Sequence, residues 1–142
     1  NNWFCQILKH KTKCRSRILG LSHEVAARSG KPVPPTKAIV GNRLFGWETG
    51  LPTGYWLKSR EMNPLIMMPY HFSMTGQPAP HIYIGKKSGA ANVTLVNERL
   101  GLAQIEDKDK VKELLHKVKE LSIQVKRDLT DEEYTKLYHE VV

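Results

Sequence analysis

All eight prolines of this chain lie between residues 32 and 80, and five of its ten glycines lie in the same stretch. Proline has no backbone N–H and glycine favours turns, so this density predicts a segment over 31–80 without a long helix or strand. Flexible linkers are polar, whereas this segment contains large apolar side chains such as Trp47, Trp56 and Phe72. We therefore expect a loop-rich connector that packs on another domain or subunit, or around a core of its own.

The first thirty residues have the pattern of one or two helices. Basic residues alternate over 9–17, and apolar residues follow near helical spacing at Ile18, Leu21 and Val25. Gly30 can adopt the left-handed conformation that ends a helix, and the prolines after it cannot continue one. Terminal helices are therefore predicted within 1–30.

A regular pattern returns at the end of the chain. An alternating β-branched and aromatic run over 80–85 predicts a short strand or small sheet. Three helices follow it: one from a Ser88 cap to about Leu100, one with an apolar stripe over 111–125, and one that opens with the capping box Thr130 and Glu133. The predicted fold is α+β and mostly helical, with terminal helices at 1–30, a connector subdomain at 31–80 and a strand-plus-helix subdomain at 81–142.

Composition excludes several classes of protein. The 142 residues are 40% apolar and carry a net charge of +8, which is ordinary for a globular chain. No apolar run approaches the roughly 20 residues of a membrane span, so we expect no membrane partner and a cytoplasmic location. The basic run over 9–17 spreads over two helix faces, which favours a solvated helix over a nucleic-acid surface. The chain opens on Asn1 without an initiator methionine or a signal-like segment, from which we expect further sequence upstream.

Cysteines and histidines show no metal pattern. Cys5 and Cys14 have neither redox nor zinc spacing, and we interpret them as reduced thiols. The alternative is a disulfide between them that closes a small loop, and their spacing is compatible with both states. The six histidines are scattered along the chain and have no ligand spacing. We therefore expect this chain to bind no metal by itself.

The run from Gly85 to Gly89 lies between the predicted strand and a predicted helix. Backbone N–H groups at such a turn can bind anions, and Lys86, Lys87 and Ser88 are the candidate anion-binding residues. The spacing does not match a P-loop, so the alternative is a glycine turn whose lysines are solvated.

Four motifs, in this order along the chain, resemble the region after the catalytic barrel in the α-isopropylmalate synthase and homocitrate synthase family: Leu21–Val25, Ser29–Gly41, Phe45–Gly50 and Ile84–Gly89. The closing run from Leu129 to Glu133 is also similar to the end of that region. The resemblance covers nearly the whole chain from Leu21 onward, and the Pro-Pro-x-Lys-x-Ile-Val-Gly and Gly-Lys-x-Ser-Gly elements together are fairly specific.

The resemblance implies small subdomains that follow a TIM barrel. In that family the barrel holds a divalent metal that binds a 2-oxo acid, and an acyl-CoA supplies the attacking enolate. The barrel's metal-binding segments are absent from this sequence, so the metal is expected in a barrel domain or barrel subunit and acyl-CoA is expected as a substrate. The post-barrel region is similar to one that crosses to the partner subunit of an oligomer and supplies part of its active site.

The chain departs from the family pattern at possible catalytic positions. Where the family commonly has Phe-x-His-Glu-Ser-Gly-x-His, this chain has Trp47 and Pro52 in place of the two histidines, and Met67 stands where a tyrosine is expected. The resemblance implies that the second of these histidines helps catalysis in the partner's active site. Proline cannot transfer a proton, so this catalytic role is vacant at Pro52. Glu48 is the ionisable residue retained in the motif and is the catalytic candidate, with a turn or cap carboxylate as the alternative.

Two classes of function follow. The first is the C-terminal region or small subunit of a synthase-like acyltransferase of amino-acid biosynthesis, acting on small molecules in a homo- or hetero-oligomer, or a relative with altered aldolase or lyase chemistry. The second is a non-catalytic module that uses the same fold for dimerisation or anion binding.

Overall fold

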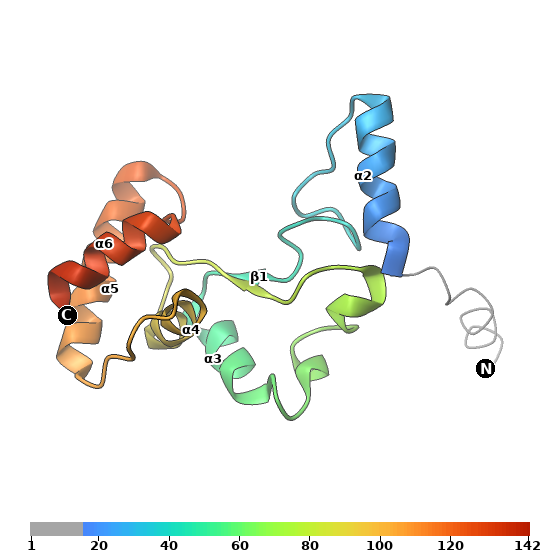
Figure 1. The fold of residues 1–142 in the computed structure, drawn as a ribbon. Coiled ribbons are helices and arrows are strands. Elements are labelled where there is room, and N and C mark those ends of the chain that lie inside the picture. The colour runs from blue at the N-terminus through green and yellow to red at the C-terminus, as the bar shows by residue number, and fades with distance from the viewer. Residues whose placement is uncertain (1–15) are drawn as a thin grey trace. The chain divides into compact units, whose positions relative to one another are not determined.

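The computed structural model describes residues 16–142, drawn in colour in Figure 1. In this part the elements in chain order are α2 (Ile18–Ser29), β1 (Gly46–Trp47), α3 (Gly50–Ser59), the 3-10 turns η2 (Pro64–Ile66) and η3 (Phe72–Thr75), β2 (His81–Ile82), α4 (Ala90–Leu100), α5 (Lys108–Val125) and α6 (Asp131–Val141). The predicted α+β, mostly helical class is confirmed. The predictions for Cys5, Cys14 and most of the basic run over 9–17 lie outside the described residues.

Contacts divide the described residues into two compact units, one of 16–45 with 68–80 and one of 46–67 with 81–142. The middle of the proline-rich connector therefore belongs with the C-terminal helices. The predicted subdomains 1–30, 31–80 and 81–142 are based on sequence composition, whereas the two units are defined by contacts between residues. The two divisions therefore describe different properties of the chain.

The first unit contains α2 and the turns that follow it. α2 ends at Gly30, which has the left-handed φ of 68° expected of a glycine after a helix. The amide of Gln77 donates to the carbonyls of Ile39 at 3.0 Å and Gly41 at 3.2 Å and so holds the turn that follows the prolines. Phe45 is buried, and its ring centre lies 5.6 Å from that of Tyr70 in an edge-to-face arrangement. Part of the aromatic connector therefore packs around a small core of its own.

The second unit packs four helices beside a two-stranded sheet. β1 and β2 are parallel, with Gly46 opposite His81 and Trp47 opposite Ile82. α4 contacts α3, α5 and β2, and α5 contacts α6. The fully buried side chains at the centre include Val96, Leu114, Val118 and Tyr134. The predicted strand over 80–85 is thus shorter than expected, because beyond Ile82 the chain turns toward α4.

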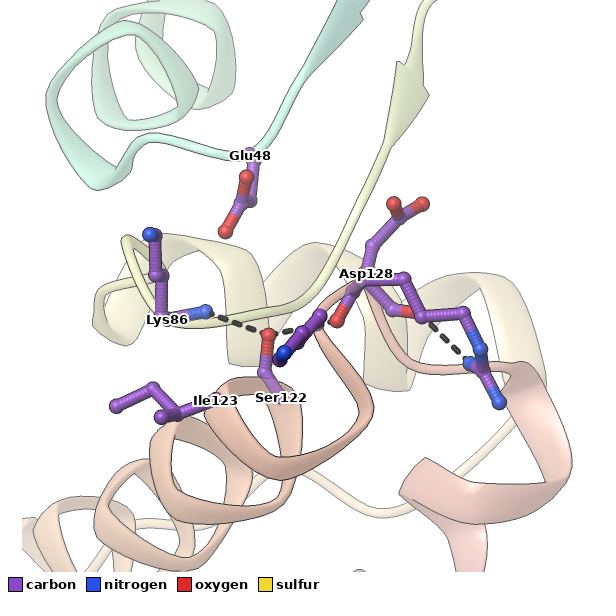
Figure 2. A pocket seen from close by; sticks show the side chains of 7 residues that line it. Glu48, Lys86, Ser122, Ile123 and Asp128 are labelled. Carbon is purple, nitrogen blue, oxygen red and sulfur yellow. Dashed lines mark hydrogen bonds between the residues drawn. The ribbon is translucent and has the colours of Figure 1, made fainter.

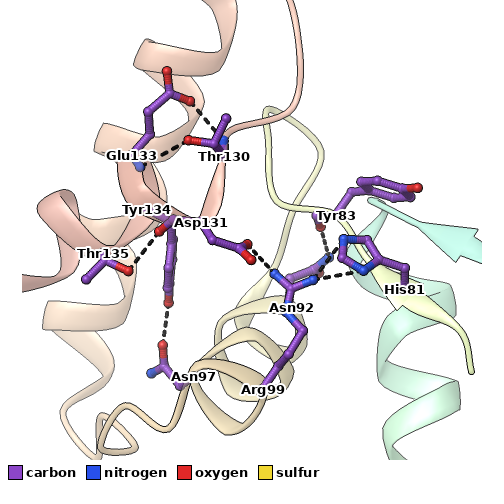
Figure 3. Close-up of polar contacts among 10 residues, drawn as sticks. All are labelled: His81, Tyr83, Asn92, Asn97, Arg99, Thr130, Asp131, Glu133, Tyr134 and Thr135. Atoms are coloured by element: carbon purple, nitrogen blue, oxygen red, sulfur yellow. Dashed lines mark hydrogen bonds and ion pairs between the residues drawn. The ribbon is translucent and has the colours of Figure 1, made fainter.

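Polar contacts join the sheet, α4 and α6 in this unit (Figure 3). The Tyr134 hydroxyl donates to Asn97 at 2.6 Å in the core, and burial raises the pKa of Tyr134 above its ordinary value. Arg99 contacts the His81 ring and pairs with Asp131 at 2.5 Å. α6 begins with the predicted capping box between Thr130 and Glu133. These contacts hold the C-terminal half of α4 against β2 and the first turn of α6.

The expectation that the connector holds no long regular element is wrong at α3, a ten-residue helix. Pro52 is its third residue, in the first turn, where a backbone N–H has no helical partner. Thr53, Trp56 and Ser59 lie three residues apart and are buried, and α3 packs on α4. Tertiary packing therefore stabilises a helix that local propensity disfavours.

The predicted cap of α4 is also shifted. α4 begins after Gly89, whose N–H donates to the Asn92 side chain at 3.0 Å. Ser88 is buried and uses its hydroxyl within the preceding turn. Among the described residues, none of the helices is long and apolar enough to cross a membrane.

Candidate functional site

The turn from Gly85 to Ser88 is closed by its own groups. Ser88 Oγ accepts from the Gly85 N–H at 2.9 Å and donates to the Glu48 carbonyl at 3.2 Å. The Ser88 N–H donates to the Gly85 carbonyl at 3.1 Å. Ser88 therefore holds the turn against the end of β1, and its hydroxyl does not face solvent.

The Glu48 carboxylate lies against the same turn. Its Oε1 accepts the Lys87 N–H at 3.1 Å, and the half-buried side chain follows directly after β1. The Asn92 amide donates to the Glu48 carbonyl at 2.8 Å and so fixes its backbone. A Cβ on Gly85 would stand 2.7 Å from Glu48 Oε1, so the carboxylate occupies space that only glycine leaves open.

Ser122 ties the end of α5 to this turn (Figure 2). Its Oγ accepts the Lys86 N–H at 3.2 Å and donates to the Arg127 carbonyl at 2.7 Å. Ser122 is buried although it lies near the C-terminal end of a surface helix. This contact brings two segments that are 36 residues apart in sequence to one place.

A cavity of about 310 Å³ lies between these elements, lined by Glu48, Lys86, Ser122, Ile123, Lys126, Arg127 and Asp128. The lining contains three cationic side chains and two carboxylates. Figure 2 shows Glu48 entering from β1, Lys86 from the turn, and Ser122 and Ile123 from α5. The arrangement can bind a small polar molecule with anionic groups.

The cations of the cavity differ in how far they are neutralised. Arg127 makes two hydrogen bonds to Glu133, at 2.9 and 2.7 Å, which raise the pKa of Arg127 and, together with the Thr130 N–H, lower the pKa of Glu133 to about 2. Within the described residues, the ammonium groups of Lys86 and Lys126 have no ion-pair partner. Two lysines thus remain to meet an anion.

The structure brings together two of the four residues singled out from the sequence. Glu48 and Lys86 line the cavity, whereas Lys87 contributes its backbone N–H and Ser88 is buried within the turn. Sequence analysis missed Ser122, Lys126 and Arg127. In the sequence these residues are distinguished only by their position near the end of the strongest predicted helix. The sequence around them does not indicate that this helix end contacts the 85–88 turn.

The two positions where the family pattern has a histidine lie beside α3 and within it. The Trp47 ring lies 5.6 Å from that of Trp56 and covers the inner face of α3. Pro52 lies in the first turn of α3. Within residues 16–142, no group of three or more histidine, cysteine or acidic side chains is placed to hold a metal ion.

Comparison with known proteins gives three informative relatives. A 2-isopropylmalate synthase 2 of Caldanaerobacter subterraneus subsp. tengcongensis is 35% identical over 130 residues, which cover 89% of this chain and 31% of that protein. Homocitrate synthase 1 of Nostoc sp. is 36% identical over 124 residues, covering 87% of this chain and 31% of the relative. A 2-isopropylmalate synthase of Thermus thermophilus is 31% identical over 115 residues, covering 80% and 33%.

These matches lie in the C-terminal region of the relatives. The chain therefore spans about a third of the length of the curated relatives it matches. No protein-family model matches the chain.

Proposed function

Because this chain is homologous to the C-terminal region of the 2-isopropylmalate and homocitrate synthases, we propose that it acts as the C-terminal region or small subunit of an enzyme of that type. The reaction is a metal-dependent Claisen-type condensation of an acyl-CoA with a 2-oxo acid. A barrel domain or barrel subunit holds the divalent metal and the acyl-CoA. The observation that carries the proposal is the match over 89% and 87% of this chain to two such synthases.

Within that enzyme, this chain supplies contacts to a neighbouring subunit. α3, η2 and the residues between them leave large apolar side chains in solvent: Leu51, Tyr55, Met62, Leu65 and Ile66, exposed by 69, 54, 81, 52 and 63%. Grouped exposed apolar residues are typical of protein interfaces. They support a contact between this surface and a barrel, in a homo- or hetero-oligomer.

The chain also supplies part of the partner's active site through Glu48 and Lys86. The Glu48 carboxylate accepts a hydrogen bond from the turn and has a second oxygen for a substrate hydroxyl or a proton. The Lys86 ammonium, with Lys87 beside it, meets carboxylate or phosphate groups of the substrates. Ser88 acts through the turn and positions both.

The vacant histidine positions favour a second candidate, a relative with altered aldolase or lyase chemistry. Neither Trp47 nor Pro52 can transfer a proton; the Trp47 ring packs on that of Trp56, and Pro52 lies in the first turn of α3. A non-catalytic module for dimerisation or anion binding remains the alternative outcome of the tests below.

The first experiment is the intact mass and metal content of the native assembly. The proposal expects a species with roughly another 250 residues of barrel per copy of this chain and bound divalent metal. Condensation assays with pairs of acyl-CoA and 2-oxo acids then identify the substrates. An assembly of 16.2 kDa chains alone, free of metal, would support the binding module instead.

Substitution at Pro52 separates the two enzyme candidates. Pro52→His restores an imidazole at the position where the resemblance expects a proton-transferring histidine. If the chemistry has moved elsewhere, kcat for condensation stays within about twofold of the parent. A gain of two orders of magnitude or more, the scale of general acid–base catalysis, would instead identify a synthase that has lost its base.

A further inference from the structure

His81 joins β2 to α4 through a side-chain contact with Arg99 (Figure 3). The Arg99 Nη1 atom lies 2.9 Å from Nδ1 and 2.8 Å from Nε2 of the His81 ring. A neutral imidazole carries its proton on one ring nitrogen, and the other nitrogen accepts a hydrogen bond. A guanidinium only donates, so in either tautomer this contact requires an uncharged His81.

Charged and titratable groups face His81 from α4, from α6 and from the chain that continues β2. Arg99 is the cation of α4, and its Nη2 lies 2.5 Å from Oδ1 of Asp131 at the start of α6. The Tyr83 ring centre lies 4.6 Å from that of His81. In β1 the residue opposite His81 is Gly46, which has no side chain. Because Asp131 holds the guanidinium from α6, a charged His81 would move away from Arg99 rather than displace it.

Protonation of His81 changes this contact in two ways. The ring loses its acceptor, because both nitrogens of an imidazolium carry a proton. It also becomes a cation beside the guanidinium of Arg99, and like charges in contact repel each other. Histidine changes its charge between about pH 5 and 8, and His81 is exposed to solvent. The stabilising contact is therefore present above this range and is lost as the pH falls through it.

The sheet that this contact supports is very small. β1 and β2 pair over two residues each, and a sheet of two strands is marginally stable unless it packs on other elements. Next to these pairs, the Tyr83 N–H donates to the Trp47 carbonyl at 2.9 Å, directly before Glu48. Loss of the contact between His81 and α4 therefore affects the backbone that carries Glu48.

We propose that His81 is a pH-sensitive latch in the second unit. When the ring is neutral, it accepts a hydrogen bond from Arg99 and holds β2 to α4. When the ring is protonated, it leaves Arg99, and the pairing of β2 with β1 opens more often. The inference goes beyond the proposed function, because it concerns a local opening of this chain and involves neither a substrate nor a reaction.

Amide hydrogen exchange of the intact protein, followed by NMR, tests the latch at Tyr83. The protection factor of its N–H corrects for the intrinsic effect of pH on exchange and reports how often the bond to Trp47 opens. We expect this factor to fall at least about threefold from about pH 7.5 to 5.5, the scale of one hydrogen bond. The Val118 N–H, at a fully buried residue of α5, is the internal reference for global unfolding. A Tyr83 factor that stays within about twofold, or falls no further than that of Val118, would overturn the inference.

Two variants remove the two partners of the latch separately. His81→Gln keeps a side-chain acceptor that does not titrate, and Arg99→Met removes the donor. In both, the Tyr83 protection factor is expected to change less than about twofold between the two pH values. His116→Gln, at an exposed histidine of α5 that faces Glu120, is the matched control and keeps the response of the parent. A full response in His81→Gln or in Arg99→Met would contradict the inference.

A third variant imitates the protonated state. His81→Lys replaces the acceptor with a side chain that is cationic at both pH values. At about pH 7.5 it is expected to lower the Tyr83 protection factor to the value that the parent has near pH 5.5, with that of Val118 unchanged. A Tyr83 factor equal to that of the parent at the higher pH would refute the latch. These measurements use no substrate, so their outcome is independent of the proposed enzyme function.

Discussion

At the scale of single residues, the site depends on one position without a side chain. A Cβ on Gly85 would lie 2.7 Å from Glu48 Oε1 and 3.0 Å from Ser122 Oγ. Both of these atoms make the hydrogen bonds that join the turn to β1 and to α5. Glycine at this position is therefore a requirement of close packing, since its φ is not in the left-handed region.

We predict that Gly85→Ala destabilises the protein by about 1–3 kcal/mol, the usual cost of overpacking. Urea unfolding measures the change. Gly54→Ala is the matched control, because the added Cβ would meet only Ala91 Cβ at an ordinary 3.9 Å and alanine favours the helix. It is expected to stabilise α3 by about 0.5–1 kcal/mol. Equal effects of the two changes would contradict this account of Gly85.

At the scale of secondary-structure elements, charge and capping define α6. Thr130 Oγ1 accepts the Glu133 N–H at 3.3 Å, and Glu133 Oε2 accepts the Thr130 N–H at 2.9 Å. The Arg127 guanidinium and this backbone N–H lower the pKa of Glu133 from 4.5 to about 2. A carboxyl whose pKa is lower in the folded protein stabilises it above the unfolded pKa and loses that effect as the pH falls through the folded pKa.

The stability difference between the parent and Glu133→Gln is therefore predicted to be largest above pH 5 and to narrow between about pH 4.5 and 2. Urea unfolding over this pH range measures it. Lys112→Gln, which removes an exposed pair with Asp109, is the control and should show little pH dependence. A constant difference from pH 7 to 3 would show that the ionised Glu133 does not stabilise α6.

α3 shows the limit of arguments from single elements. Its sequence contains two glycines and a proline, yet three of its residues are buried and it packs on α4. Trp56 is 8% exposed and lies beside Trp47. The contribution of this packing exceeds the loss of local helix propensity, because burying one large aromatic ring stabilises by about 2–3 kcal/mol.

At the scale of the whole molecule, α3, η2 and the residues between them leave large apolar side chains exposed to solvent. Ile66 and Met62 are 63% and 81% exposed although both are strongly apolar. A buried interface would remove this surface from water. The proposed contact with a barrel therefore makes a prediction about assembly.

We predict that Ile66→Asp weakens the native assembly at least about tenfold in dissociation constant, because the new carboxylate would lose its water in the interface. Analytical ultracentrifugation at a series of concentrations measures this. Leu21→Asp, at a residue of α2 that is 65% exposed, is the matched control and should leave the dissociation constant unchanged. Unchanged assembly in Ile66→Asp would place the interface elsewhere.

Much of the fold was predictable where the information is local. Apolar spacing over 111–125 predicted α5, the Thr130 and Glu133 pair predicted the start of α6, and Gly30 predicted the end of α2. Motif order indicated the resemblance to 2-isopropylmalate and homocitrate synthases, and the relatives that match this chain carry those names. For the site, Glu48 and Lys86 were predictable from their motifs.

Only the tertiary structure decided which residues share the cavity. Ser122 contacts the backbone of Lys86 across 36 positions, and this contact places Lys126 and Arg127 beside Glu48. The tertiary structure also showed that residues 50–59 form the helix α3 and that Ser88 is a buried part of the turn. Helix ends and caps depend on hydrogen bonds between near neighbours, which local sequence encodes, whereas a site between β1, the 85–88 turn and α5 depends on packing between distant segments, which local sequence does not.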